Sequence, residues 1–192
     1  MKVVAINGSA RRDGNTDKLI SEAFRSLEDA DVECEVVGLA GLELHGCKAC
    51  WSCGGRQGCV FGNDSFNEIF EKMKTADGII LASPVYTGNI SASLQAVLER
   101  AAVVCDMNRD ARLLSGKAGG CLAVARRGGA LNTLDVMANF FLLQDMFVAG
   151  STYWPIAYGQ MPGDVMEDVE GIETARRLGE NMTLLLGALG HE

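Results

Sequence analysis

The sequence has no excess of basic residues, no long hydrophobic run and no internal repeat. Its 192 residues include 17 Lys and Arg against 25 Asp and Glu, a net charge of -8 at pH 7. A surface that binds nucleic acid needs a basic patch or stripe, so nucleic acid is excluded as a partner. The N-terminal apolar run covers only residues 3–6, which is too short for a signal peptide or a membrane span. We therefore expect a soluble, cytoplasmic protein that does not enter a membrane.

The hydrophobic fraction of 48% is that of a globular chain. No linker interrupts residues 1–192, and this length fills one core. We therefore expect a single domain, with one irregular Gly- and Cys-rich insertion at about 40–62.

Apolar runs that suit strands alternate with segments of helical periodicity. We expect strands at Lys2–Asn7, Glu33–Leu39, Gly78–Ala82, near Ala118–Ala125 and near Val148–Trp154. We expect helices from about Thr16, after Asp64 or Ser65, across residues 90–101, near Leu131–Met146 and near Met166–Leu189. This alternation predicts an α/β three-layer sandwich with a five-stranded parallel sheet of order 2-1-3-4-5. Ligands of such folds bind beyond the carboxyl ends of the strands, so the loops after strands one, three and four are the candidate site.

The first of these loops, 8-GSARRDGNT-16, combines glycines, short polar side chains and arginines just before a helix. Amides at a helix N-terminus bind phosphate, and arginine supplies a counter-charge. The loop lacks the Lys of a Walker A motif and the G-x-G-x-x-G of a dinucleotide site, so a monophosphate such as that of FMN fits better. The alternative is an ordinary turn with Asn15 or Thr16 as the N-cap. The candidate phosphate-binding residues are Ser9, Arg11, Gly14, Asn15 and Thr16, with Arg12 as a further counter-charge.

The loops after strands three and four, 83-SPVYTGNIS-91 and 125-ARRGGAL-131, suit a planar cofactor. Tyr86 offers a flat ring for stacking, and Gly88 lets the backbone approach a ligand. Arg126 or Arg127 can counter the charge of a reduced flavin. The alternatives are a plain Pro/Gly turn with a surface tyrosine, and the start of a helix.

In this order and spacing, the three loops resemble those of the flavodoxin-like NADPH-dependent FMN reductase superfamily. The resemblance continues through 158-YGQMPGDVMEDVEGIETARRLGENM-182. It departs at Ala10, where many relatives have proline, and at Gln95 and Glu99, which replace a common Lys and Asp. The resemblance implies that the first loop holds the FMN phosphate and that the other two embrace the isoalloxazine ring. The implied ring-binding residues are Pro84, Val85, Tyr86, Thr87, Gly88, Arg126, Arg127 and Gly128.

Seven cysteines cannot all pair, and scattered cysteines are usually buried, inert thiols, which fits Cys34, Cys105 and Cys121. The other four form 47-CKACWSCGGRQGC-59, with the spacing C-x2-C-x2-C-x5-C. Such runs are typical of iron–sulfur sites; zinc usually takes two separated C-x2-C pairs. A loop without metal, inert or forming a disulfide, remains a third possibility. His45 is a possible further ligand, although a lone loop histidine is more often a bystander.

The full motif resembles that of the iron–sulfur flavoproteins, which implies a [4Fe–4S] cluster on Cys47, Cys50, Cys53 and Cys59. It departs from relatives at Asn63-Asp64-Ser65, where they often have two aspartates and a hydrophobic residue. The resemblance implies an electron-transfer oxidoreductase with ferredoxin or NAD(P)H as donor, a small-molecule acceptor, and a homodimer or homotetramer. Since the flavin carries the chemistry, no catalytic acid or base is expected. The alternatives are a cluster-free NAD(P)H-dependent FMN or quinone reductase, and a non-catalytic carrier or redox sensor whose thiols form a disulfide.

Overall fold

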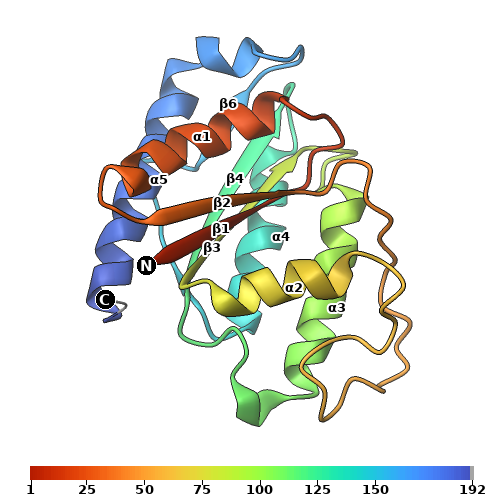
Figure 1. The fold of residues 1–192 in the computed structure, drawn as a ribbon. Helices are drawn as coiled ribbons and strands as arrows, with labels where there is room; N and C mark the ends of the chain where they lie inside the picture. Colours follow the sequence, from red (N-terminus) through yellow and green to blue (C-terminus); the bar gives the residue numbers. More distant parts are fainter. Residues whose placement is uncertain (191–192) are drawn as a thin grey trace.

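A computed structural model describes residues 1–190 of the chain (Figure 1). The strands are β1 (Lys2–Asn7), β2 (Glu33–Gly38), β3 (Gly78–Pro84), β4 (Ala118–Ala125), β5 (Phe147–Val148) and β6 (Ile156–Tyr158). The helices are α1 (Asn15–Glu28), α2 (Phe66–Thr75), α3 (Ala92–Asp106), α4 (Ala130–Leu143) and α5 (Val169–Ala188), with short 3₁₀ turns η1 (Arg109–Ala111) and η2 (Asp164–Glu167). Within residues 1–190, no helix is both long and apolar enough to cross a membrane.

The sheet is parallel and has the order β2-β1-β3-β4-β5, with β6 also paired to β4. The predicted fold class and strand order are therefore confirmed. β4 is buried along its whole length and β3 along nearly all of it. Strands covered on both faces need continuous apolar sequence, which explains why these two could be recognised from composition alone.

Helices cover both faces of the sheet (Figure 1). α1 and α5 pack against one face, where Leu19, Ile20 and Leu178 belong to one buried cluster. α2, α3 and α4 pack against the other face around a second cluster that includes Phe70 and Phe141. The periodic apolar stripes of these helices are the residues that the two clusters bury.

The fifth strand was predicted as one element at Val148–Trp154, and this prediction is wrong. Val148 pairs with Gly119 and Ile156 pairs with Ala123. Between these two pairs the edge advances by eight residues while β4 advances by only four. The surplus residues leave the sheet as a loop, in which the Ser151 hydroxyl donates a 2.8 Å hydrogen bond to the Thr174 carbonyl. The edge strand therefore consists of two short pieces, β5 and β6.

The start of α1 also differs from the expectation, because Gly14 and not Asn15 or Thr16 is the N-cap. The carboxylate of Asp17 turns back and accepts a 3.0 Å hydrogen bond from the Gly14 amide. It also accepts one of 2.7 Å from the Asn7 side chain at the end of β1. The carboxylate thus fixes the first turn of α1 to the strand that precedes it.

Candidate functional site

The loops after β3 and β4 touch each other beyond the carboxyl ends of the strands. Gly129 lies so close to the first of them that a Cβ there would stand 2.8 Å from the Gly88 Cα and 3.1 Å from Val85 Cγ1. The Asn132 side chain donates a 2.7 Å hydrogen bond to the Gly88 carbonyl. The loop after β1 reaches the same edge, since a Cβ on Gly8 would lie 2.7 Å from the Ser91 hydroxyl. The structure therefore brings the three loops to one edge of the sheet.

The loop after β1 has the shape of an anion-binding turn. Ser9 is buried, and its hydroxyl accepts a 3.1 Å hydrogen bond from the Arg11 amide. Thr16 is also buried, in the first helical turn, where the amides have no partner within the helix. The guanidinium of Arg11 is exposed and donates to the Gln160 carbonyl at 3.1 Å. The amides at the start of α1, with the Ser9 and Thr16 hydroxyls, can bind a phosphate.

The Asn15 side chain has a different role from the one expected of it. Its oxygen accepts a 2.7 Å hydrogen bond from the Gly163 amide, and its nitrogen donates at 2.9 Å to the Met161 carbonyl. Asn15 therefore ties the start of α1 to a fourth loop, residues 159–165, while its backbone amide and the second N–H of its side chain have no partner in these contacts. Gly159 approaches so closely that a Cβ there would lie 2.8 Å from the Asn15 side-chain nitrogen.

Sequence reasoning did not assign this fourth loop to the site. The run 159-GQMPGDV-165 gave a signal, since two glycines and a proline mark a turn. Nothing in this run indicates that the turn packs against the start of α1. The Asn15–Gly163 hydrogen bond joins residues that are 148 positions apart in the sequence.

The loop after β3 is a tight reverse turn at residues 86–89. The Asn89 amide donates to the Tyr86 carbonyl at 3.1 Å, and Thr87 and Gly88 both have positive φ, 55° and 74°. These angles are those of a type I′ turn. The Tyr86 ring is left 42% exposed at the edge of the sheet, where it is free to stack on a planar ligand.

The loop after β4 presents the remaining predicted residues to solvent. Arg126, Arg127 and Gly128 are exposed, and Ala125 ends the strand directly before them. The residues predicted to bind the ring, with Pro84 and Val85 partly buried beside them, therefore lie on adjacent loops. Their individual roles toward FMN stay predictions.

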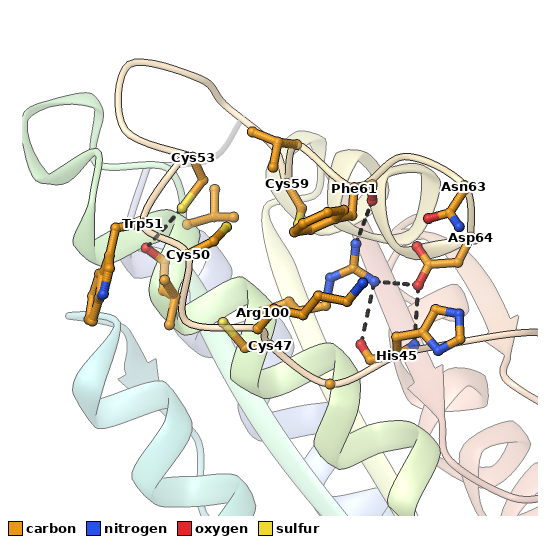
Figure 2. Close-up of a pocket in the computed structure, with 15 residues that line it drawn as sticks. His45, Cys47, Cys50, Trp51, Cys53, Cys59, Phe61, Asn63, Asp64 and Arg100 are labelled. Carbon is orange, nitrogen blue, oxygen red and sulfur yellow. Dashed lines mark hydrogen bonds and ion pairs between the residues drawn. The ribbon is translucent and has the colours of Figure 1, made fainter.

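The four cysteines of the irregular loop line one pocket, which Figure 2 shows. Cys47, Cys50, Cys53 and Cys59 are all free thiols. In Figure 2 they lie on one side of the pocket, with Arg100 and Asp64 on the other. His45 also lines it, and Trp51 lies at its rim. Within residues 1–190, however, no three His, Cys, Asp or Glu side chains are gathered closely enough to hold a metal.

The donor set fits an iron–sulfur cluster in its chemistry, because such clusters are held by four thiolates. Burial raises the pKa of Cys53 above its ordinary value, and the nearby Cys59, Cys50 and Cys47 thiols raise it further. Coordination to a cation would favour the thiolate form of these cysteines. Cys50 is exposed, and hydrogen bonds from Ser52 lower its pKa.

The other three thiols are inert core residues, as the sequence indicates. Burial raises the pKa of both Cys34 and Cys105 to about 12. Burial also raises that of Cys121, which lies within β4. A neutral thiol is a poor nucleophile and a poor ligand, so these three are no part of the site.

The cysteine segment, residues 47–59, runs beside the later part of α3, whereas the three flavin-side loops lie near its start (Figure 1). Ser91 caps the start of α3 beside the flavin-side loops. The Cys53 thiol contacts the Val103 carbonyl at 3.9 Å, and the Cys53 carbonyl accepts from the Asn108 side chain at 3.0 Å. Measured from Ser91, the contacts of the cysteine segment with α3 begin eight residues along and reach Val103 twelve residues along. At 1.5 Å per residue, the two regions are therefore about 12–18 Å apart along the helix.

The chain matches known proteins over most of its length. Residues 1–160 match the family model of the NADPH-dependent FMN reductases. An iron-sulfur flavoprotein of Methanocaldococcus jannaschii is 40% identical over 192 residues, with 95% of each chain covered. An iron-sulfur flavoprotein of Methanosarcina thermophila is 33% identical over 189 residues, covering 96% of this chain and 97% of the relative.

Solved structures share the fold at low sequence identity. RosB, with a bound 8-demethyl-8-formylriboflavin-5'-phosphate intermediate, superposes with a TM-score of 0.76 at 20% identity, covering 100% of this chain and 81% of RosB. An NADH:FMN oxidoreductase in its apo form gives a TM-score of 0.67 at 20% identity, covering 100% and 91%. Together with the sequence matches, these show that the chain belongs to the NADPH-dependent FMN reductase family and is an FMN-dependent oxidoreductase.

Proposed function

We propose that this oxidoreductase holds a [4Fe–4S] cluster on Cys47, Cys50, Cys53 and Cys59 and passes electrons between that cluster and FMN. The observation that carries the proposal is the pocket, which four free thiols of one thirteen-residue segment line together. The two relatives at 40% and 33% identity carry the name iron-sulfur flavoprotein. When bound, the two groups would supply single-electron transfer and one- or two-electron flavin chemistry.

The chain's own residues bind and orient these groups. In this proposal the amides at the start of α1, with Ser9 and Thr16, bind the FMN phosphate, and Arg11 supplies positive charge nearby. The turn at 86–89 offers the Tyr86 ring to one side of a planar group, and Arg126 and Arg127 lie exposed on the neighbouring loop. We assign no side chain as an acid or base.

The backbone of the cysteine loop supports a role in metal binding. Ala49 and Trp51, which lie between the first three cysteines, have positive φ of 48° and 57°. Such residues cost about 1–2 kcal/mol each, and this strain usually persists where a site requires the conformation. Winding the chain in this way turns successive thiols toward one pocket.

The separation of about 12–18 Å along α3 leads us to propose that the cluster and the flavin that exchange electrons belong to different subunits. A homodimer or homotetramer would bring the cysteine loop of one copy toward the flavin-side loops of another. Trp51 is 58% exposed at the tip of that loop and offers an apolar contact for a neighbouring subunit.

The electron donor in this proposal is ferredoxin or NAD(P)H, and the acceptor is a small molecule. The exposed Tyr86, Arg126 and Arg127 leave one side of the flavin site open to either. Fast reduction by ferredoxin with slow NADPH turnover would support the first donor, and the reverse would support the second.

A cluster-free NAD(P)H-dependent FMN or quinone reductase is the second candidate. The pocket lined by the four cysteines measures ≈ 30 Å³, which is room for about one water molecule. This small volume favours a protein that holds no cluster there. A Bacillus subtilis relative at 23% identity over 186 residues is named a putative NAD(P)H-dependent FMN-containing oxidoreductase.

The deciding experiment measures iron, zinc, acid-labile sulfide and FMN per chain in protein purified without oxygen. About four iron and four sulfide per FMN are expected for a cubane on four thiolates. Replacement of Cys50 by Ala should abolish the iron and leave FMN bound, whereas Cys105→Ala, a core thiol, should keep both. FMN without iron or zinc, in protein also resistant to reconstitution with iron and sulfide, would leave the cluster-free reductase as the function.

A further inference from the structure

The two ends of the cysteine loop are joined at one buried side chain, Arg100 of α3 (Figure 2). Its guanidinium is paired with the Asp64 carboxylate, and both side chains are almost wholly buried, 3% and 1% exposed. Nη2 donates at 2.8 Å to the carbonyl of Phe61, just after the last cysteine. Nη1 contacts the carbonyl of His45, just before the first cysteine, at 3.4 Å.

Asp64 completes the arrangement from the other side. One of its oxygens accepts from the His45 amide at 3.1 Å, and the other accepts from the Phe66 amide at 3.3 Å, at the start of α2. Both backbone groups of His45 are therefore held, the carbonyl by Arg100 and the amide by Asp64. These contacts with the cation and the backbone outweigh burial and lower the pKa of Asp64, so the pair is charged.

The planar shape of the guanidinium is needed for these contacts. It lies over the Phe66 ring, 4.1 Å from its centroid, while its edge serves Asp64 and two carbonyls in different directions. A lysine ammonium has the charge but not the fixed fork of donors. Burial of an ion pair carries a desolvation penalty that can cancel the attraction between the charges. A gain in overall stability therefore does not by itself explain this pair.

Glu99 of α3 and Asn108, just after α3, hold the loop between these ends. The Glu99 carboxylate accepts a 3.4 Å hydrogen bond from the Cys47 amide, and the Asn108 side chain donates to the Cys53 carbonyl at 3.0 Å. The loop is thus fixed at its start and its end to α3, and in its middle to the turn that follows α3. Arg100 is the buried member of this series and the one that joins both ends.

We propose that Arg100, with Asp64, is a positioning residue that holds the two ends of the cysteine loop together before any cluster is bound. The proposal rests on the function proposed above. Bringing the two ends of a loop of this length together costs conformational entropy. The Arg100–Asp64 pair already holds the ends together in the metal-free fold, so this entropy is lost before the cluster binds. The four thiols then need less ordering when iron and sulfide enter, which raises the affinity for the cluster.

The test compares three variants purified as full-length protein with FMN bound. The double variant Arg100→Met with Asp64→Leu removes both charges, so that no unpaired buried ion is left to unfold the chain. Arg100→Lys keeps the charge but not the fork. Arg109→Met is the matched control, since it removes an arginine whose pair with Asp106 is exposed near the other end of α3.

The first readout is hydrogen exchange of residues 45–61 in the metal-free protein. The double variant should exchange there about tenfold faster or more, since several charge-assisted hydrogen bonds are lost, while the core strands and the FMN content stay unchanged. Arg100→Lys should be intermediate and Arg109→Met should match the wild type. Unchanged exchange in a folded double variant would overturn the inference, whatever the metal content of the protein.

The second readout is iron and sulfide bound after anaerobic reconstitution. The double variant should need about tenfold more iron and sulfide for half-loading, with Arg100→Lys recovering part of the loss. Wild-type loading in the double variant would overturn the proposal. Absence of iron from the wild type itself would instead count against the proposed function, so the two failures are distinguishable.

Discussion

Gly129 is the residue at which the loops after β3 and β4 make contact. Its φ is +88°, and a Cβ there would stand 2.8 Å from the backbone of Gly88. We predict that Gly129→Ala weakens FMN binding about tenfold or more, because the new methyl group separates the two loops and the backbone conformation costs about 1–2 kcal/mol.

Titration of flavin-stripped protein with FMN, followed by fluorescence quenching, measures this change. Gly150→Ala is the control, since a Cβ at Gly150 meets no atom within 4 Å and its φ is not positive. Equal FMN affinities in the two variants would show that the contact between the loops does not shape the flavin site.

The seven thiols should separate by reactivity in metal-free protein at pH 8. Burial raises the pKa of Cys34 and Cys105 to about 12, so little thiolate forms there until the pH approaches that value. Cys50 is exposed and its pKa is lowered, so it should be alkylated first. Mass spectrometry after timed iodoacetamide treatment measures the order, with protein unfolded in guanidinium as the control in which all seven react. Labelling of Cys105 as fast as Cys50 would contradict the structure.

At the scale of elements, α1 and α5 cross at a glycine. A Cβ on Gly179 would lie 2.2 Å from the Ala23 carbonyl oxygen, whereas Gly187 of the same helix has open space around it. We predict that Gly179→Ala lowers the free energy of unfolding by about 1–3 kcal/mol, through overpacking of the crossing.

Gly187→Ala should instead raise the free energy of unfolding, by up to about 1 kcal/mol, because alanine restricts the unfolded chain and favours the helix. Urea denaturation of the two variants, monitored by circular dichroism, gives both values. Effects of the same sign would show that the α1–α5 crossing is not close-packed.

The regular elements were predictable because burial leaves a periodic trace in the sequence. β3 and β4 are continuous apolar runs, and the apolar stripes of the helices match the two buried clusters. The interruption between β5 and β6 was not predictable, because the residues on both sides of 150–152 suit a strand. The point at which the chain leaves the sheet depends on how β5 and β6 pair with β4, and the sequence of one strand does not contain that pairing register.

Side-chain pairings over long sequence distances were also beyond the sequence. Asp64 was expected only as a helix cap, and its side chain does accept from the Phe66 amide, yet its main partner is Arg100, 36 residues away. Asn15 has the residue type of a phosphate ligand, but Gly163 and Met161 occupy its side chain. The three loops could be placed at one edge because parallel topology requires it; their mutual contacts depend on individual atoms.

For the whole molecule, the two proposed redox sites lie about 12–18 Å apart along α3 within one chain. We predict that electron transfer between cluster and FMN depends on association of subunits, because transfer slows steeply with distance. Rapid-mixing spectroscopy of the reduced protein over a dilution series, with mass followed by sedimentation, tests this. Coupled bleaching of the two groups should be lost as the oligomer dissociates, while FMN content per chain stays constant. A transfer rate independent of dissociation would place both partners in one subunit.

The two outer strands of the sheet have a further consequence, for self-association. On one side the sheet ends in pieces of two and three residues, β5 and β6. On the other side it ends in β2, where Glu33 and Glu35 form ion pairs with Lys2 and Lys72. Short strands and charged side chains both oppose the addition of a strand from another molecule, the first step toward amyloid-like aggregates. Copies of this protein should therefore assemble through helices and loops, and a concentrated, partly oxidised preparation should form dimers linked by a disulfide at the exposed Cys50 before it forms fibrils.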